Sequence, residues 1–195
     1  MAKSDSAAAK KERRKTIRWV VTIFLVTILV SALITMISDA LMEVSTMVVA
    51  FLILLVIILI GIIFDVVGMA VASADEKPFH SMAARRVHGA QESIRLLRNA
   101  ERVSSICNDV VGDICGVVSG SAAATIAAQI LTRMDGFAWP QLCSLLMSAF
   151  VAGLTVGGKA IGKTYAVNSC TKIVHCVGKL VWGITHIPEL MKRKK

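Results

Sequence analysis

Residues 45–73 read STMVVAFLILLVIILIGIIFDVVGMAVAS, and Asp65 is the only charged side chain among them. A helix needs about 20 consecutive apolar residues to cross the hydrocarbon core of a bilayer, so this stretch predicts a transmembrane helix. Residues 19–37 form a second run of sufficient length and carry no charge. The chain is 55% hydrophobic with a mean hydropathy of +0.70, values that soluble domains rarely reach. The sequence therefore predicts an integral membrane protein.

Two further spans are expected in the second half of the chain. Residues 103–131 are more polar and rich in small residues that suit close contact between helices, namely Gly112, Gly116, Ser119, Gly120 and Ser121. Pro140 suits the first turn of a helix, and we expect the fourth span to reach about Val156 and to be short or broken at Gly157 and Gly158. With 195 residues, the predicted fold is an all-α membrane protein of about four transmembrane helices without a separate soluble domain.

The positive charges indicate the orientation of these spans. Lys and Arg number seven in residues 1–18, six in 74–102 and eight in 159–195, whereas the loops 38–44 and 133–141 hold one between them. Loops rich in Lys and Arg stay in the cytoplasm, so both termini and the central connection are predicted to be cytoplasmic, in a cell membrane protein. The net charge of +9 is explained by this topology and by anionic lipid. No nucleic-acid motif accompanies it, and no nucleic-acid partner is predicted.

The amino-terminal region has two interpretations. Residues 1–16 are predicted to be a basic cytoplasmic tail, and residues 17–38 an additional transmembrane helix or an uncleaved signal anchor. A cleavable signal peptide ending near residues 38–40 is the alternative, although its apolar core is long for one. Either interpretation leaves the topology of residues 46–190 unchanged.

Two segments have the pattern of amphipathic juxtamembrane helices, residues 78–100 and residues 164–186. Their apolar residues recur at spacings of three and four, with the charges mostly off that stripe. The charged residues form a predicted lipid or partner surface, which comprises Arg85, Arg86, Arg95, Arg98, Lys172 and Lys179. We expect this surface to contact anionic lipid at the cytoplasmic face; the alternative is that the two helices pack on one another.

Polar groups inside the third span are the strongest functional signal. Asn108, Asp109 and Asp113 lie in an apolar run, and Asp109 and Asp113 share one face of a regular helix because they are four residues apart. A charged side chain at the bilayer centre costs about 2.5–3.5 kcal/mol on insertion scales and usually marks an ion path or a buried partner. The cluster predicts ion handling. Asp65 is a further pathway candidate; the alternative is a structural role, such as pairing with a basic residue or bonding Ser and Thr hydroxyls.

Three motifs occur in a characteristic order. Gly89-Ala90 precedes Ser93-Ile-Arg-Leu-Leu-Arg-Asn99, then Arg102-Val-Ser-Ser-Ile leads into Gly116-Val-Val-Ser-Gly120, and Gly158-Lys-Ala-Ile-Gly-Lys163 follows the fourth span. Together with the order of spans, residues 46–190 resemble the transmembrane domain of the cyclin M and CorC family, which is associated with transport of magnesium and other divalent cations. The last motif corresponds to the family pattern Gly-Glu-x-x-Pro-Lys.

This resemblance implies a homodimer and a cation site made of oxygen ligands. Ser73 and Glu76 are the residues that match the family's Ser-Gly-x-Glu stretch, and Asn108 is the expected contribution of the next helix. Asp109 and Asp113 complete the predicted ligand set for Mg²⁺ as a bound or transported ion, since Mg²⁺ prefers oxygen ligands and retains several waters.

Two departures from the family pattern favour a different role. Lys159 replaces the family's Glu and Gly162 replaces its Pro, and a positive charge near the path would repel a cation. The alternative is therefore a non-transporting membrane module that regulates or accompanies another membrane protein. The five cysteines lack CxxC spacing, and no phosphate loop, nucleophile elbow or HExxH motif is present, so no enzyme is predicted.

Overall fold

The computed structural model describes residues 2–44, 46–133 and 140–192, and nearly all of them are helical. A short π-helix, η1, interrupts the third long helix and joins α5 to α6. The elements in chain order are α1 (Ala2–Val44), α2 (Met47–Ser73), α3 (Lys77–Ala84), α4 (Ala90–Arg98), α5 (Ala100–Ser105), η1 (Ile106–Gly112), α6 (Asp113–Arg133), α7 (Pro140–Asn168) and α8 (Cys170–Lys192).

Four helical segments are long and apolar enough to cross a membrane. They are Thr16–Leu41, Met47–Ser73, Ala100–Thr132 and Gln141–Asn168. The predicted all-α fold with four candidate spans is therefore confirmed. The third segment runs through α5, η1 and α6 as one continuous stretch.

The fourth span differs from the prediction, because α7 continues through Gly157 and Gly158 to Asn168. Gly158 and Gly162 allow close packing on α2 instead of ending the helix. A Cβ atom at Gly158 would meet the side chain of Ile62, and one at Gly162 would meet Val66. The predicted helix of residues 164–186 accordingly begins later, at Cys170 in α8.

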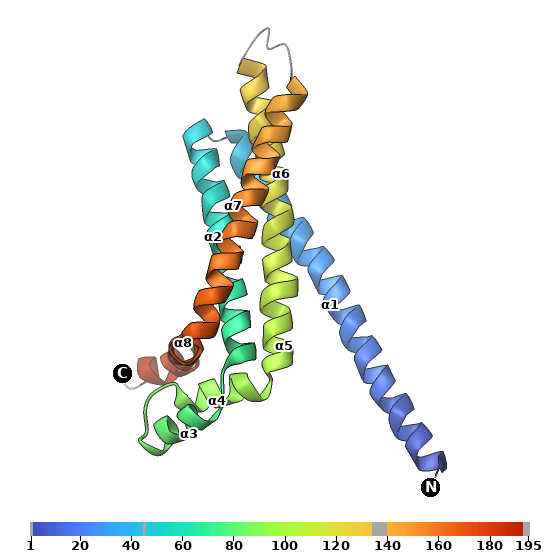
Figure 1. Ribbon diagram of the computed structural model, residues 1–195, viewed down its shortest axis with the longest axis vertical. Coiled ribbons are helices and arrows are strands. Elements are labelled where there is room, and N and C mark those ends of the chain that lie inside the picture. Colours follow the sequence, from blue (N-terminus) through green and yellow to red (C-terminus); the bar gives the residue numbers. More distant parts are fainter. Residues whose placement is uncertain (1, 45, 134–139, 193–195) are drawn as a thin grey trace.

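The helices α2, α6 and α7 form the bundle, and α1 packs along α6 before leaning away from it toward its amino terminus (Figure 1). Buried residues of α2, α6 and α7 make one core cluster, which includes Leu54, Ile126 and Val151. A second row of α6 and η1 residues packs against Ile23 and Val30 of α1. Helix α1 is thus peripheral to the bundle.

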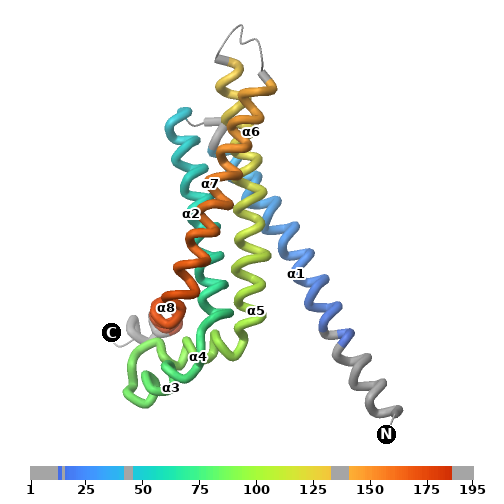
Figure 2. Tube along the Cα trace, in the orientation of Figure 1, coloured from blue at the N-terminus to red at the C-terminus, as the bar shows by residue number. Residues whose placement is uncertain are grey.

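At one end of the bundle, α8 turns across the bundle axis beside α3 and α4 (Figure 2). Ser93 of α4 donates a hydrogen bond to the Val174 carbonyl of α8 at 3.2 Å. A Cβ at Gly178 would meet the Ser93 hydroxyl, so this glycine lets α8 approach α4 closely. Phe79 of α3 is fully buried in the cluster beneath this crossing.

The predicted single helix of residues 78–100 is wrong in one respect, since it is divided into α3 and α4. Arg86 and Gly89 adopt φ angles of 54° and 84° in the connecting turn. These left-handed conformations cannot continue a helix, so the chain turns between the two short helices. The apolar stripe that suggested one helix instead packs two helices against α2 and α8.

Candidate functional site

The most buried charge of the bundle is Asp65, in the carboxyl-terminal third of α2, and it pairs with Lys159 of α7. The distance from Lys159 Nζ to Asp65 Oδ2 is 3.2 Å, and the side chains are 4% and 20% exposed. Lys159 Nζ also donates to the Gly112 carbonyl at 3.2 Å. An ammonium group therefore bridges three helical segments, α2, η1 and α7, inside the bundle.

Glycines bring α2 and η1 into close contact at this level. A Cβ at Gly112 would collide with Asp65 Oδ1, and one at Gly68 would lie 3.0 Å from Cys107 Cβ and collide with Asn108 Oδ1. The π-helical segment adds a wider turn where it faces Gly68 of α2. Such segments occur frequently at functional sites. This α2–η1 contact is the candidate site.

Asn108 places an unsatisfied oxygen in this contact. Its Nδ2 donates to Ser104 Oγ at 3.2 Å, which fixes the amide plane. Its Oδ1 is buried and has no hydrogen-bond partner among the residues that the structure describes. A buried polar atom without a partner costs about 1–3 kcal/mol, and such atoms call for a water, an ion or strain as an explanation.

Asp109 and Asp113, the other predicted ligands of this helix, are both exposed. Asp109 accepts a hydrogen bond from Ser105 Oγ at 2.8 Å. Asp113 lines an open cavity of about 500 Å³ between α6 and α7, together with Ser119, Thr155 and Lys159. The structure therefore places the two carboxylates on the outside of the bundle, with Asp113 near Lys159.

Ser73 and Glu76 lie at the end of α2 that meets α3 and α4. Ser73 is exposed. Glu76 Oε2 is 3.3 Å from His80 Nε2 and 4.0 Å from Arg98 Nε, an arrangement with substantial solvent exposure. Within residues 2–44, 46–133 and 140–192, no three His, Cys, Asp or Glu side chains gather in a group that could hold a metal. Glu76 is thus not assembled with Asp109 and Asp113.

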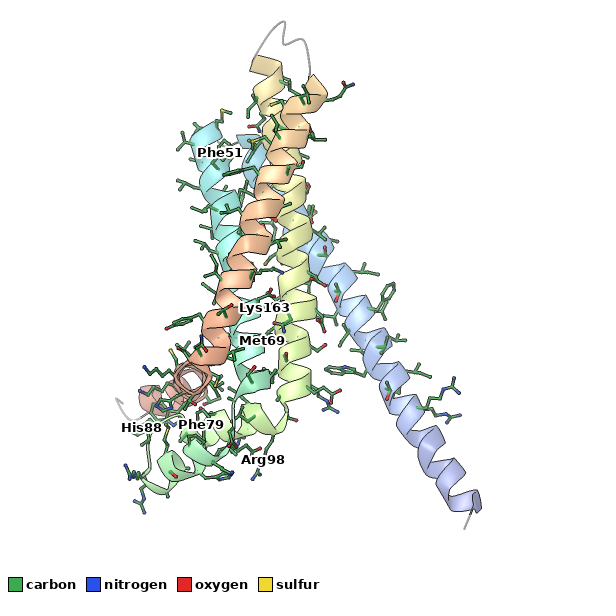
Figure 3. The ribbon with its side chains drawn as sticks, viewed as in Figure 1. Phe51, Met69, Phe79, His88, Arg98 and Lys163 are labelled. Atoms are coloured by element: carbon green, nitrogen blue, oxygen red, sulfur yellow. The ribbon has the colours of Figure 1, made fainter. Side chains whose placement is uncertain are left out.

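The predicted lipid or partner surface is exposed throughout and lies at one end of the bundle. Its members come from the α3–α4 turn, α4 and α8, and they are Arg85, Arg86, Arg95, Arg98, Lys172 and Lys179. Figure 3 shows Arg98 and His88 at this end and Phe51 at the other.

The Asp65–Lys159 pair is the feature that sequence reasoning missed. Asp65 was expected either on a pathway or paired to an unspecified base, and Lys159 was noted only as a departure from a family pattern. The sequence feature that could have indicated this pair is the presence of one carboxylate, Asp65, and one ammonium, Lys159, within separate candidate spans. Their contact required the fourth helix to continue beyond Val156.

Comparisons of the chain with models of known protein families, with curated proteins and with solved structures found no match.

Proposed function

We propose that this protein binds a divalent, magnesium-like cation and conducts it across the membrane along the α2–η1 contact. The observation that carries the proposal is the buried Asn108 Oδ1, an oxygen without a hydrogen-bond donor in the part of the chain described, facing Gly68. A carbonyl oxygen of this kind is a ligand that Mg²⁺ accepts while retaining several waters. The absence of a Cβ at Gly68 leaves room for the amide oxygen.

Asp65 lies three residues before Gly68, about 4.5 Å along the axis of α2. On η1, Asn108 lies opposite Gly68, and Gly112 lies opposite Asp65. The unsatisfied amide oxygen and the buried carboxylate are therefore successive oxygen groups along one helix contact. A partly hydrated ion that leaves Asn108 meets Asp65 next.

Lys159 sets the barrier on this route. Its ammonium neutralises Asp65 and occupies the oxygens of Asp65 and Gly112, as a cation would. An ion passing this point competes with a tethered positive charge. Displacement of the Lys159 ammonium toward the open cavity beside α6 would free the Asp65 carboxylate. Asp113 in that cavity offers the ammonium a second acceptor.

A homodimer explains the exposed carboxylates of the third span. In a single chain Asp109 is exposed and Asp113 lines the open α6–α7 cavity. A carboxylate left to face hydrocarbon near the bilayer centre would cost about 2.5–3.5 kcal/mol. Gly116 and Gly120 on the same helix have no heavy atom within 4 Å of an added Cβ, so a second helix could approach closely there. A symmetric dimer would cover these groups. The family resemblance to cyclin M and CorC proteins supports the same assembly.

The end formed by α3, α4 and α8 is proposed to face the cytoplasm. Its exposed arginines and lysines suit the anionic headgroups of the inner leaflet. Both termini would then be cytoplasmic, in accordance with the distribution of positive charge.

The second candidate function is a non-transporting membrane subunit that regulates a partner. The Asp65–Lys159 pair favours it specifically, because the deepest carboxylate is already neutralised by the protein's own cation. In that case the exposed Asp109 and Asp113 would meet a different membrane protein instead of a second copy.

Flux measurements on the full chain in liposomes distinguish these functions. Wild type should admit Mg²⁺ to an entrapped fluorescent indicator, and Asn108→Ala should reduce the rate at least about tenfold while remaining folded. Asn99→Ala is the matched control, because its amide is exposed and bonds only locally to the Arg95 carbonyl. Absence of flux in wild type, with no Mg²⁺-dependent thermal shift, would favour the partner subunit.

A further inference from the structure

A second cavity lies away from the ion path, between the α3–α4 turn and α8. Its volume is about 460 Å³, and its polar lining includes Arg86, His88, Glu92 and Trp182. Figure 3 shows His88 at this end of the molecule, near α8. The cavity adjoins the basic surface that we place at the membrane, but its composition is different because it contains a carboxylate.

Glu92 is the unusual member of this lining. Only 9% of the residue is exposed, and no hydrogen bond or ion pair joins its carboxylate to another residue in the described ranges. Its oxygens are not among the buried side-chain atoms that lack a partner, so the carboxylate opens onto the cavity. The first turn of α4, where Glu92 lies, favours a negative charge through the helix dipole. The cavity therefore presents an unused anion to a ligand.

Aromatic rings adjoin this carboxylate in the cavity. The rings of His88 and Trp182 contact each other, with centroids 4.6 Å apart and planes inclined at 40°. The face of a tryptophan attracts ammonium groups. Glu92 and Trp182 together suit an organic cation, and a carboxylate acceptor favours a primary ammonium, which donates hydrogen bonds, over a quaternary one.

Groups that suit an anion line the same cavity. Gly89 is the N-cap of α4, and no side chain caps the helix. The Ala90 N–H donates to the Val87 carbonyl, so the N–H groups of Gln91 and Glu92 remain available. Gly89 and Gln91 line the cavity beside Arg86. Backbone N–H groups at a helix N-terminus combined with a guanidinium are suited to phosphate. The left-handed backbone of Arg86 shapes the turn at this point.

We propose that this cavity binds a phosphoethanolamine group, with the phosphate on Arg86 and the α4 N-terminus and the ammonium on Glu92 beside Trp182. A purely anionic ligand would be repelled by Glu92, and a simple cation by Arg86. The zwitterion presents its phosphate to Arg86 and its ammonium to Glu92. Its source is either the headgroup of phosphatidylethanolamine or a soluble phosphoethanolamine, which share this chemistry. The site does not depend on the proposed cation path.

Binding of the purified full chain in mixed micelles tests the site. Native mass spectrometry should show dioleoyl phosphatidylethanolamine bound at least about tenfold more tightly than the phosphatidylcholine analogue. Glu92→Gln should remove that preference, because the ammonium loses its ionic partner, whereas Arg86→Gln should weaken both lipids. Lys77→Gln is the matched control, since Lys77 is an exposed basic residue of α3 that does not line the cavity. If Glu92→Gln does not fold, Arg86→Gln, on an exposed turn residue, retains the test.

Competition by soluble phosphoethanolamine in the same assay would assign the soluble source, and failure to compete would assign the lipid. Equal binding of the two lipids by wild type, or an unchanged preference in Glu92→Gln, would overturn the proposal. Tighter binding of phosphatidylglycerol than of phosphatidylethanolamine would also overturn it, because it would indicate a simple anionic lipid surface.

Discussion

Removing one member of the Asp65–Lys159 pair should destabilise the bundle more than removing both. The two groups are 3.2 Å apart and mostly buried, and loss of one partner from a buried pair typically costs about 3–5 kcal/mol. Lys159→Met leaves a carboxylate that is 4% exposed, so we expect a loss of about 3 kcal/mol, or a factor of more than about 100 in the unfolding equilibrium.

Asp65→Asn should cost less, about 1–2 kcal/mol, because the Lys159 side chain is 20% exposed and can extend toward the open cavity. The double variant Asp65→Asn with Lys159→Met should lose only about 1 kcal/mol, the cost of leaving the Gly112 carbonyl without its donor. The two single losses thus sum to about 4–5 kcal/mol, and the double variant falls well short of that sum.

The assay is denaturant unfolding in mixed micelles, followed by tryptophan fluorescence. Lys163→Met is the matched control, because Lys163 is exposed on the same helix (Figure 3) and should change stability by less than about 0.5 kcal/mol. Additive losses in the double variant, or single variants as stable as wild type, would refute the energetic role assigned to the pair.

Gly68→Ala should destabilise the α2–η1 contact by about 1–3 kcal/mol and abolish any Mg²⁺-dependent thermal shift, because the new Cβ would collide with Asn108 Oδ1; Gly153→Ala, where an added Cβ meets no heavy atom within 4 Å, should leave both unchanged. Burial, and then the charge of Lys179, lower the pKa of His175 below its ordinary 6.5, so the unfolded chain binds the proton more readily and stability should fall as the pH drops below about 6.5. Thermal unfolding across pH 5–8 measures this, and His175→Gln should flatten that part of the profile; an equal pH dependence in the variant would contradict the assignment.

Span lengths were predictable because hydrophobic length is a local property of the sequence. Residues 45–73 and 19–37 needed no knowledge of their neighbours, and the structure has long apolar helical segments at Met47–Ser73 and Thr16–Leu41. The candidate spans follow from such counts, whereas the peripheral position of the first helix does not.

Features that depend on tertiary contacts were not predictable in the same way. Gly157 and Gly158 suggested the end of a helix, but the close approach of α7 to α2 uses this glycine-rich stretch inside a helix. The division of residues 78–100 depends on the left-handed Arg86 and Gly89, and hydrophobic periodicity does not report such conformations.

The candidate site was predicted only in part. The sequence identified Asn108 as polar within a span, and the structure shows its oxygen buried without a partner among the described residues. The prediction that Asp109 and Asp113 share one face, because they are four residues apart, assumed a regular α-helix. In the structure Asp109 lies in the π-helical segment and Asp113 follows it. A π-helix changes the relation between spacing and face, since its bonds join residues five apart.

The most direct test of the proposed cation path is a structure of the full chain determined with Mn²⁺, whose anomalous scattering identifies the ion in place of Mg²⁺. The ion should lie between α2 and η1, with Asn108 Oδ1 at about 2.1 Å or joined to it through one bound water. An ion bound elsewhere at saturating Mn²⁺, for example at Glu76, with Asn108 still unoccupied, would contradict the path proposed along this contact.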